Sequence, residues 1–89
     1  MSGITASDLG NDETIERLYL HACNQGWWEN SAKHFRDYIG LAEYALRTCE
    51  EIERVGGLFT WLIKNKMTSR ISNDDEDRAH ARWKEITYE

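Results

Sequence analysis

The chain has 89 residues and carries 16 Asp and Glu against 11 Lys and Arg, which gives a formal net charge of −5 at pH 7. A length below about 100 residues leaves room for one hydrophobic core, which excludes a multidomain organisation for this sequence. The excess of acid argues against non-specific attraction to nucleic acid, because phosphate binding depends on accumulated Lys and Arg.

Membrane insertion and secretion are also disfavoured. No apolar run approaches the roughly 18 residues that a membrane span needs, and the N-terminus lacks a basic and then apolar signal pattern. The two cysteines, Cys23 and Cys49, are too few for a secreted disulfide framework, and each falls on the apolar face of a predicted helix. We therefore expect buried thiols, a cytoplasmic location and no membrane partner.

The first part of the chain predicts an arm and then a helix. Residues 1–10 are small and polar, so we expect a flexible N-terminal arm, with the helical domain spanning residues 11–89. Asn11 or Asp8 can cap a helix that Gly26 ends in the left-handed conformation. Apolar side chains recur on one face at Ile15, Leu18, Tyr19, Ala22 and Cys23.

The middle of the chain allows two interpretations. After Trp27 and Trp28, either Asn30 or Ser31 can cap a helix whose apolar positions recur at helical spacing as far as Cys49. One interpretation is a single helix over residues 32–54, in which Gly40 costs about 1 kcal/mol relative to Ala. The other is a helix-turn-helix with the turn at residues 39–41. We favour the single helix.

The remaining sequence predicts two further helices. Gly56 and Gly57 are expected to end the preceding helix, and residues 58–63 are apolar on nearly every side, which predicts the most buried helix of the fold. Ser72 is expected to cap the last helix, with acids at the positive end of its dipole. The fold class is therefore an all-α single domain, a small bundle of four or five helices.

No pattern of catalytic or metal-binding residues is found. The candidate nucleophiles and bases, Cys23, Cys49, His21, His34 and His80, lie in no catalytic motif. His21 and Cys23 are two residues apart, so their side chains point about 200° apart on a helix and cannot share an ion. The sequence predicts a protein that is not an enzyme and has no metal or cofactor.

Two features depart from an evenly acidic helical chain. The stretch 54–70 contains no acid, and its bases, with those of the last helix, are candidates for contact with a phosphate backbone, although they also suit the solubilising ends of a buried helix. These candidates are Arg54, Lys64, Lys66, Arg70, Arg78 and Arg82. The adjacent Trp27 and Trp28 cannot both point inward from one connection, so an exposed ring is a candidate interface anchor.

The segment 40–86 resembles the C-terminal tail that follows the winged-helix DNA-binding region in replication-initiator-like proteins of plasmids and phages. The resemblance rests on GGLFTWLIKNK, with Gly57, Leu58, Phe59, Trp61 and Leu62, and on the helix start SNDDEDRA downstream. It implies an origin on a mobile element and an association with DNA transactions. The chain lacks a recognition helix of the kind such proteins use.

These features predict a non-enzymatic phage or plasmid accessory protein that binds a host or phage protein or nucleoprotein complex, for example as an inhibitor such as an anti-CRISPR protein. Its acidic surface would compete for a basic site on that partner. The candidate residues are Asp12, Glu13, Glu16, Glu50, Glu51, Glu53, Asp74, Asp75, Glu76 and Asp77. The alternatives are a small DNA-binding replication or regulatory module and a structural homodimer.

Overall fold

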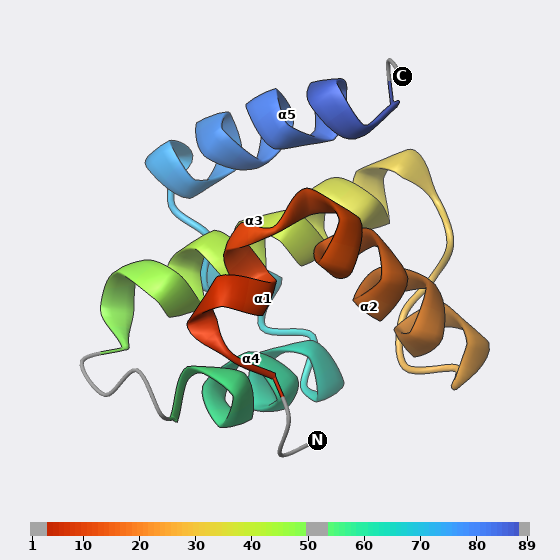
Figure 1. Ribbon diagram of the computed structural model, residues 1–89, viewed down its shortest axis with the longest axis horizontal. Helices are drawn as coiled ribbons and strands as arrows, with labels where there is room; N and C mark the ends of the chain where they lie inside the picture. The colour runs from red at the N-terminus through yellow and green to blue at the C-terminus, as the bar shows by residue number, and fades with distance from the viewer. Residues whose placement is uncertain (1–3, 50–53, 88–89) are drawn as a thin grey trace.

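A computed structural model describes residues 4–49 and 54–87 of the chain. It contains α1 (Ala6–Gly10), α2 (Asp12–Asn24), α3 (Ala32–Thr48), α4 (Val55–Lys64), the short 3-10 helix η2 (Thr68–Arg70) and α5 (Asn73–Thr87). The described residues form no strand. The predicted all-α bundle is therefore confirmed, and Figure 1 shows α3 in its middle, between α5 on one side and α4 on the other.

Helix α3 is central because it packs against α1, α2, α4, η2 and α5. It buries seven residues, Phe35, Tyr38, Ile39, Gly40, Leu41, Ala42 and Ala45. Residues 58–63 lie in α4, which buries five of its ten residues, a larger share than the seven of seventeen in α3, so the predicted burial is confirmed for most of this helix. The predicted central position is wrong, and Trp61 is 50% exposed. An apolar sequence on all sides marks burial only when neighbours cover every side, and here α4 lies at the edge of the bundle (Figure 1).

Helix α3 runs through Gly40 without a break, so the single-helix interpretation is correct and the helix-turn-helix is not. Its end at Thr48 comes before the predicted residue 54. Gly40 lies under Ile71, and a Cβ at this position would be 3.1 Å from Ile71 Cδ1. The glycine therefore allows the segment before α5 to approach α3 closely.

The predicted flexible arm is wrong for residues 4–10. Thr5 and Asp8 form a capping box at the start of α1, with the Asp8 N–H donating to Thr5 Oγ1 at 3.2 Å. Leu9 is fully buried in the core. Sequence reasoning missed this helix because one apolar residue in a five-residue helix makes no periodic pattern.

The N-terminal segment packs against one of the two adjacent glycines of α4. Gly56 and Gly57 both lie inside α4, contrary to the prediction. A Cβ on Gly56 would overlap the backbone carbonyl of Ile4, so this glycine allows the N-terminal segment to cross α4 in contact with its backbone.

The other helix signals were correctly predicted. The side chains of Asn11 and Ser31 cap α2 and α3, and Ser72 Oγ accepts the N–H of Asp75 at the start of α5. Gly26 follows α2 with a φ of 78°, the left-handed conformation. The local capping rules thus decided these boundaries without help from tertiary packing.

No described helix combines the length and the apolar character required to cross a membrane. The expectation of fully buried thiols is wrong, because Cys23 and Cys49 both have intermediate exposure. They pack against the edge of the core instead of within it.

Candidate docking surface

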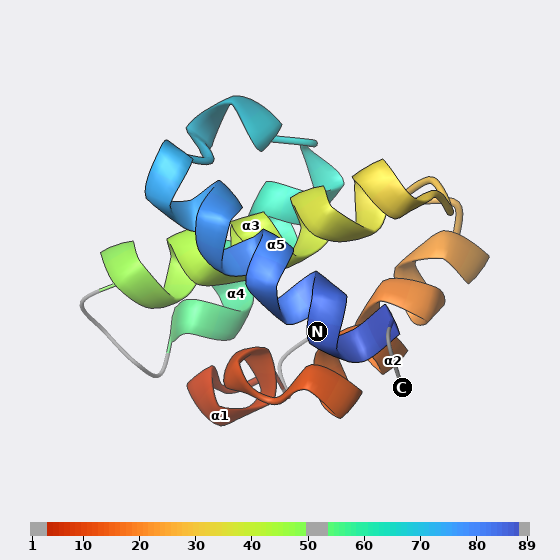
Figure 2. The same ribbon diagram turned by 90° about the horizontal axis from the view of Figure 1, so that it is seen from above.

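The start of α2 and the end of α5 together form a hollow of about 420 Å³. Figure 2 shows the end of α5 lying over the beginning of α2. We call this feature the acidic hollow; it is lined by Asn11, Asp12, Glu13, Glu16, Glu85 and Ile86. Three of the four carboxylates, those of Glu13, Glu16 and Glu85, belong to exposed residues.

Arg82 donates a hydrogen bond to Asp12, one of the residues that line the acidic hollow. Its Nε donates to Asp12 Oδ1 at 2.8 Å, its Nη1 to Glu43 Oε1 at 3.0 Å and its Nη2 to the Leu9 carbonyl at 2.9 Å. The side chain is only 14% exposed. The prediction that Arg82 contacts nucleic acid is therefore wrong for this fold, because the guanidinium is committed to α1, α2 and α3.

The acids of the α5 start divide into one buried and three exposed residues. Asp75 is fully buried and accepts from Arg47 Nε at 3.1 Å and from Arg47 Nη2 at 3.0 Å, so its predicted role in partner binding is wrong. Asp74, Glu76 and Asp77 are exposed.

Residues Glu50, Glu51 and Glu53, also predicted to bind a partner, lie outside the described residues. The acidic surface that the structure brings together is therefore smaller than the predicted set. It consists of the acidic hollow and the exposed acids of the first turns of α5.

Glu76 and Asp77 line a second hollow, of about 350 Å³, between the start of α3 and α5. Its lining also contains Lys33, Arg36 and His80, so its charge is mixed. Lys33 forms an ion pair with Asp37 on the same helix, and the Arg36 guanidinium lies 5.3 Å from the centre of the Trp83 ring. This mixture gives the second hollow no clear charge preference for a partner.

The two adjacent tryptophans have different surroundings. The prediction that the two rings do not both point inward is confirmed. Trp28 is 5% exposed and its Nε1 donates to the His34 carbonyl at 2.7 Å, so Trp28 is not available as an anchor. Trp27 is partly exposed, with Lys64 Nζ 4.8 Å from its ring centre and His21 packed against its edge. Of these two tryptophans, only Trp27 exposes part of its side chain to solvent.

The predicted basic residues are divided between two sides of the molecule. Lys64, Lys66 and Arg70 are exposed around the end of α4 and in η2, whereas Arg78 is exposed on α5. Arg54 precedes α4 and is exposed. The six bases therefore do not form one continuous surface, since Arg82 is withdrawn and Arg78 lies on the opposite side of α3 from α4 (Figure 1).

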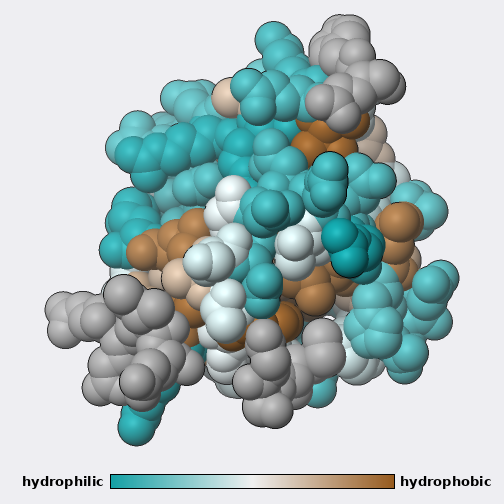
Figure 3. All heavy atoms as spheres, viewed as in Figure 1, coloured by the Kyte–Doolittle hydropathy of each residue, from teal (hydrophilic) through white to brown (hydrophobic). Residues whose placement is uncertain are grey.

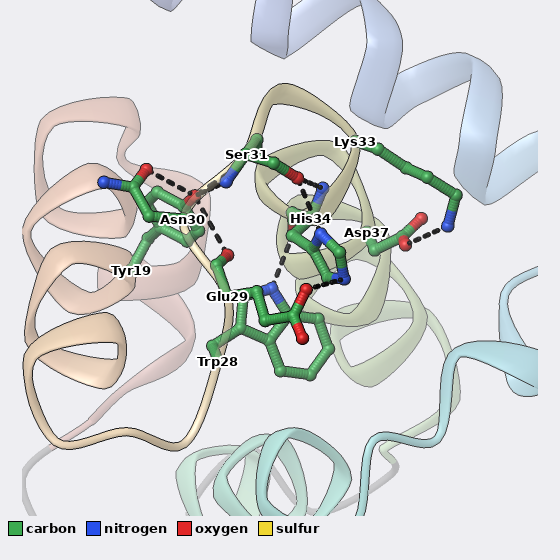
Figure 4. A network of polar contacts seen from close by, with 8 residues as sticks. All are labelled: Tyr19, Trp28, Glu29, Asn30, Ser31, Lys33, His34 and Asp37. Atoms are coloured by element: carbon green, nitrogen blue, oxygen red, sulfur yellow. Dashed lines mark hydrogen bonds and ion pairs between the residues drawn. The ribbon is translucent and has the colours of Figure 1, made fainter.

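A polar network fixes the start of α3 (Figure 4). Ser31 Oγ lies 2.6 Å from His34 Nδ1, and His34 Nε2 lies 3.3 Å from Glu29 Oε2. Although the order Ser–His–carboxylate is that of hydrolase triads, Ser31 Oγ already accepts the His34 N–H as the helix cap and the Glu29 side chain is 73% exposed. The network caps the start of α3.

Tyr19 belongs to the same network from α2. Its hydroxyl accepts the Ser31 N–H at 3.0 Å and lies 3.1 Å from Asn30 Oδ1. Burial raises the pKa of Tyr19 to about 12. Within residues 4–49 and 54–87, no three His, Cys, Asp or Glu side chains come together in a group suited to a metal ion.

Glu85 was missed by sequence reasoning, although one signal pointed to it. It lies in the last turns of α5, where the helix dipole disfavours an acid. A residue that opposes the dipole and also lacks a described ion pair has no stabilising role in the helix.

Comparison with known proteins finds no matching family model, no matching curated protein and no matching solved structure.

Proposed function

We propose that this chain is a non-enzymatic accessory protein of a phage or plasmid, which binds a basic segment of a host or phage protein or nucleoprotein complex through the acidic hollow. The observation that carries the proposal is the gathering of Glu13, Glu16 and Glu85 around one concave surface from two helices that are distant in the sequence. The mobile-element origin rests on the sequence resemblance of residues 40–86.

The charges of the acidic hollow support a basic partner. Asp12 shares Arg82 with Glu43, whereas the described ion pairs include none of the three exposed glutamates. Their carboxylates therefore keep their charge toward solvent, where they attract Lys and Arg of a partner and raise the rate of association. Partly buried Ile86 offers an apolar contact beside them for the aliphatic stem of a Lys or Arg.

The surface around the acidic hollow is consistent with this use. Figure 3 shows hydrophilic residues covering most of the α5 side of the molecule, with hydrophobic residues gathered lower on the same face. A mainly polar rim around a small apolar contact is typical of interfaces that form and dissociate, whereas an obligate interface is more apolar.

A peptide titration tests the proposal. The ¹⁵N-labelled protein is titrated at low salt with a short Lys- and Arg-rich peptide, and we expect chemical-shift changes to concentrate at residues 11–16 and 85–86. Neutralising the three glutamates together (E13Q, E16Q and E85Q) should weaken binding roughly 3- to 150-fold, because each exposed charge pair contributes about 0.2–1 kcal/mol.

A matched variant separates the site from overall charge. The combination D74N, E76Q and D77N also removes three exposed negative charges, but from the start of α5. We expect it to weaken binding much less. Equal loss in both triple variants, or no binding of the peptide at low salt, would contradict the proposal.

A further inference from the structure

Helix α4 exposes an aromatic ring next to a bare stretch of backbone. Trp61 is 50% exposed, and Gly57, one turn before it, is exposed. Among the described residues, no atom outside the nearby backbone of α4 would lie within 4 Å of a Cβ added at Gly57. A helical side chain covers the turn that precedes it, which here is the turn of Gly57. Since Gly57 presents no side chain there, the indole keeps an open surface for a flat partner.

Three cations follow the indole along the chain. Lys64, Lys66 and Arg70 are all exposed, and none takes part in a described ion pair. The sequence from residue 54 to residue 70 contains no Asp or Glu. Lys64 ends α4, on the opposite side of α3 from α5 (Figure 1), whereas Arg70 ends η2, four residues before Asp74 of α5.

We infer that Trp61, Lys64, Lys66 and Arg70 form a platform for single-stranded nucleic acid. One unpaired base stacks on the Trp61 indole while the neighbouring phosphates contact the three cations. Stacking needs only one open aromatic surface, and the charge of this stretch matches that of a phosphate chain. We call these four residues the Trp61 platform.

Two other occupants fit less well. A DNA duplex keeps its bases stacked on one another and so offers no base to Trp61. An acidic protein segment docks through several apolar anchors in a groove, whereas the described part of the chain exposes only two large hydrophobic side chains, Leu20 and Trp61. None of the three hollows that we describe at the surface includes Trp61.

The third of these hollows borders the platform at Lys66. It has a volume of about 140 Å³ and a lining of mixed charge, which consists of Trp28, Glu29, Lys33, His34, Asp37, Lys66 and Thr68. This platform is distinct from the acidic hollow and does not depend on it. Because the protein has a net charge of −5 and the platform supplies three cations, binding should be weak and sensitive to salt.

Fluorescence anisotropy with a labelled oligothymidylate of about a dozen nucleotides tests the inference. We expect binding at low salt with a log–log dependence on salt of slope about −2, the value for three cations on a single strand. W61A should weaken binding roughly 5- to 150-fold, the range for loss of one base–aromatic stack. W61F should restore most of that loss, because it restores an aromatic surface.

Matched controls distinguish this site from general charge effects. K64A with K66A should weaken binding clearly more than R78A with K84A, which removes two exposed cations of α5 instead. Circular dichroism of each variant verifies the fold. An oligoglutamate of similar length and a duplex of the same length should compete poorly.

Three results would overturn the inference: no binding of oligothymidylate at low salt, equal affinity of W61A and wild type, or equal competition by oligoglutamate. The last result would instead assign the platform to an acidic protein segment. Since the E13Q, E16Q and E85Q combination leaves the platform intact, failure of the acidic hollow and failure of the platform are separable.

Discussion

Replacement of Asp75 by asparagine removes the charge of a carboxylate that joins two helices. Asp75 is fully buried at the start of α5, accepts two hydrogen bonds from Arg47 of α3 and accepts the Ser72 N–H at 3.1 Å. The amide introduced by D75N would keep one acceptor and turn two N–H donors toward a site lined with donors. Hydrogen bonds to charged groups contribute about 1.5–3 kcal/mol, so we expect D75N to cost about 2 kcal/mol of unfolding free energy.

Urea denaturation measures this loss. With an m-value of about 1 kcal/mol per molar for a domain of this size, the midpoint should fall by about 2 M. The control is D74N, which removes the adjacent, exposed acid from the same helix end. Its cost should stay below about 1 kcal/mol, the contribution of an acid to the helix dipole. Equal midpoints for D75N and D74N would refute the reasoning.

The Asp75 carboxylate also makes the free energy of unfolding depend on pH, in a direction that its pKa determines. Burial alone would raise the pKa of Asp75, but the hydrogen bonds from Arg47 and Ser72 outweigh it and hold the pKa below its ordinary value of 3.8. The folded state therefore prefers the ionised form more than the unfolded state does. The stability difference between wild type and D75N should be complete above about pH 4 and shrink as the pH falls through the folded pKa.

Two further substitutions test the packing of the N-terminal segment and of the α3 start by urea or thermal denaturation. G56A should destabilise by about 1–3 kcal/mol, because the new Cβ overlaps the Ile4 carbonyl, whereas G57A in open space should be neutral or stabilise by up to about 1 kcal/mol; the same sign for both would contradict the close approach. Y19F should cost about 1 kcal/mol through loss of the hydrogen bond to the Ser31 N–H. Because the pKa of Tyr19 is about 12, that cost should decrease as the pH rises above 10.0, and a cost that does not change with pH would contradict the raised pKa.

The sequence was sufficient for features that depend on neighbouring residues. The all-α class, the caps at Asn11, Ser31 and Ser72, and the left-handed Gly26 all follow from hydrophobic period and capping chemistry. These interactions span three or four residues, so they are present in the pattern before any tertiary contact forms.

The residues proposed to bind a partner were predicted less well, because the solvent exposure of a side chain depends on tertiary packing and not on its sequence neighbours. Asp75 is followed at once by two further acids that the sequence does not distinguish from it, yet it alone is buried, because Arg47 of α3 lies opposite. The sequence grouped Arg82 with the other bases as a candidate for nucleic-acid contact, but in the fold its guanidinium binds Asp12, Glu43 and the Leu9 carbonyl. Whether a charged side chain forms an ion pair within the protein depends on how helices distant in the sequence pack together.

The sequence by itself determined the all-α class, the caps of α2, α3 and α5, and the segregation of charge along the chain. Tertiary structure alone decided that α3 and not α4 is central, that residues 4–10 fold, and that Glu85 joins Glu13 and Glu16 around one hollow. The physical reason is that a helix boundary depends on backbone hydrogen bonds within one turn, whereas burial and the grouping of charges depend on which helix faces lie against each other.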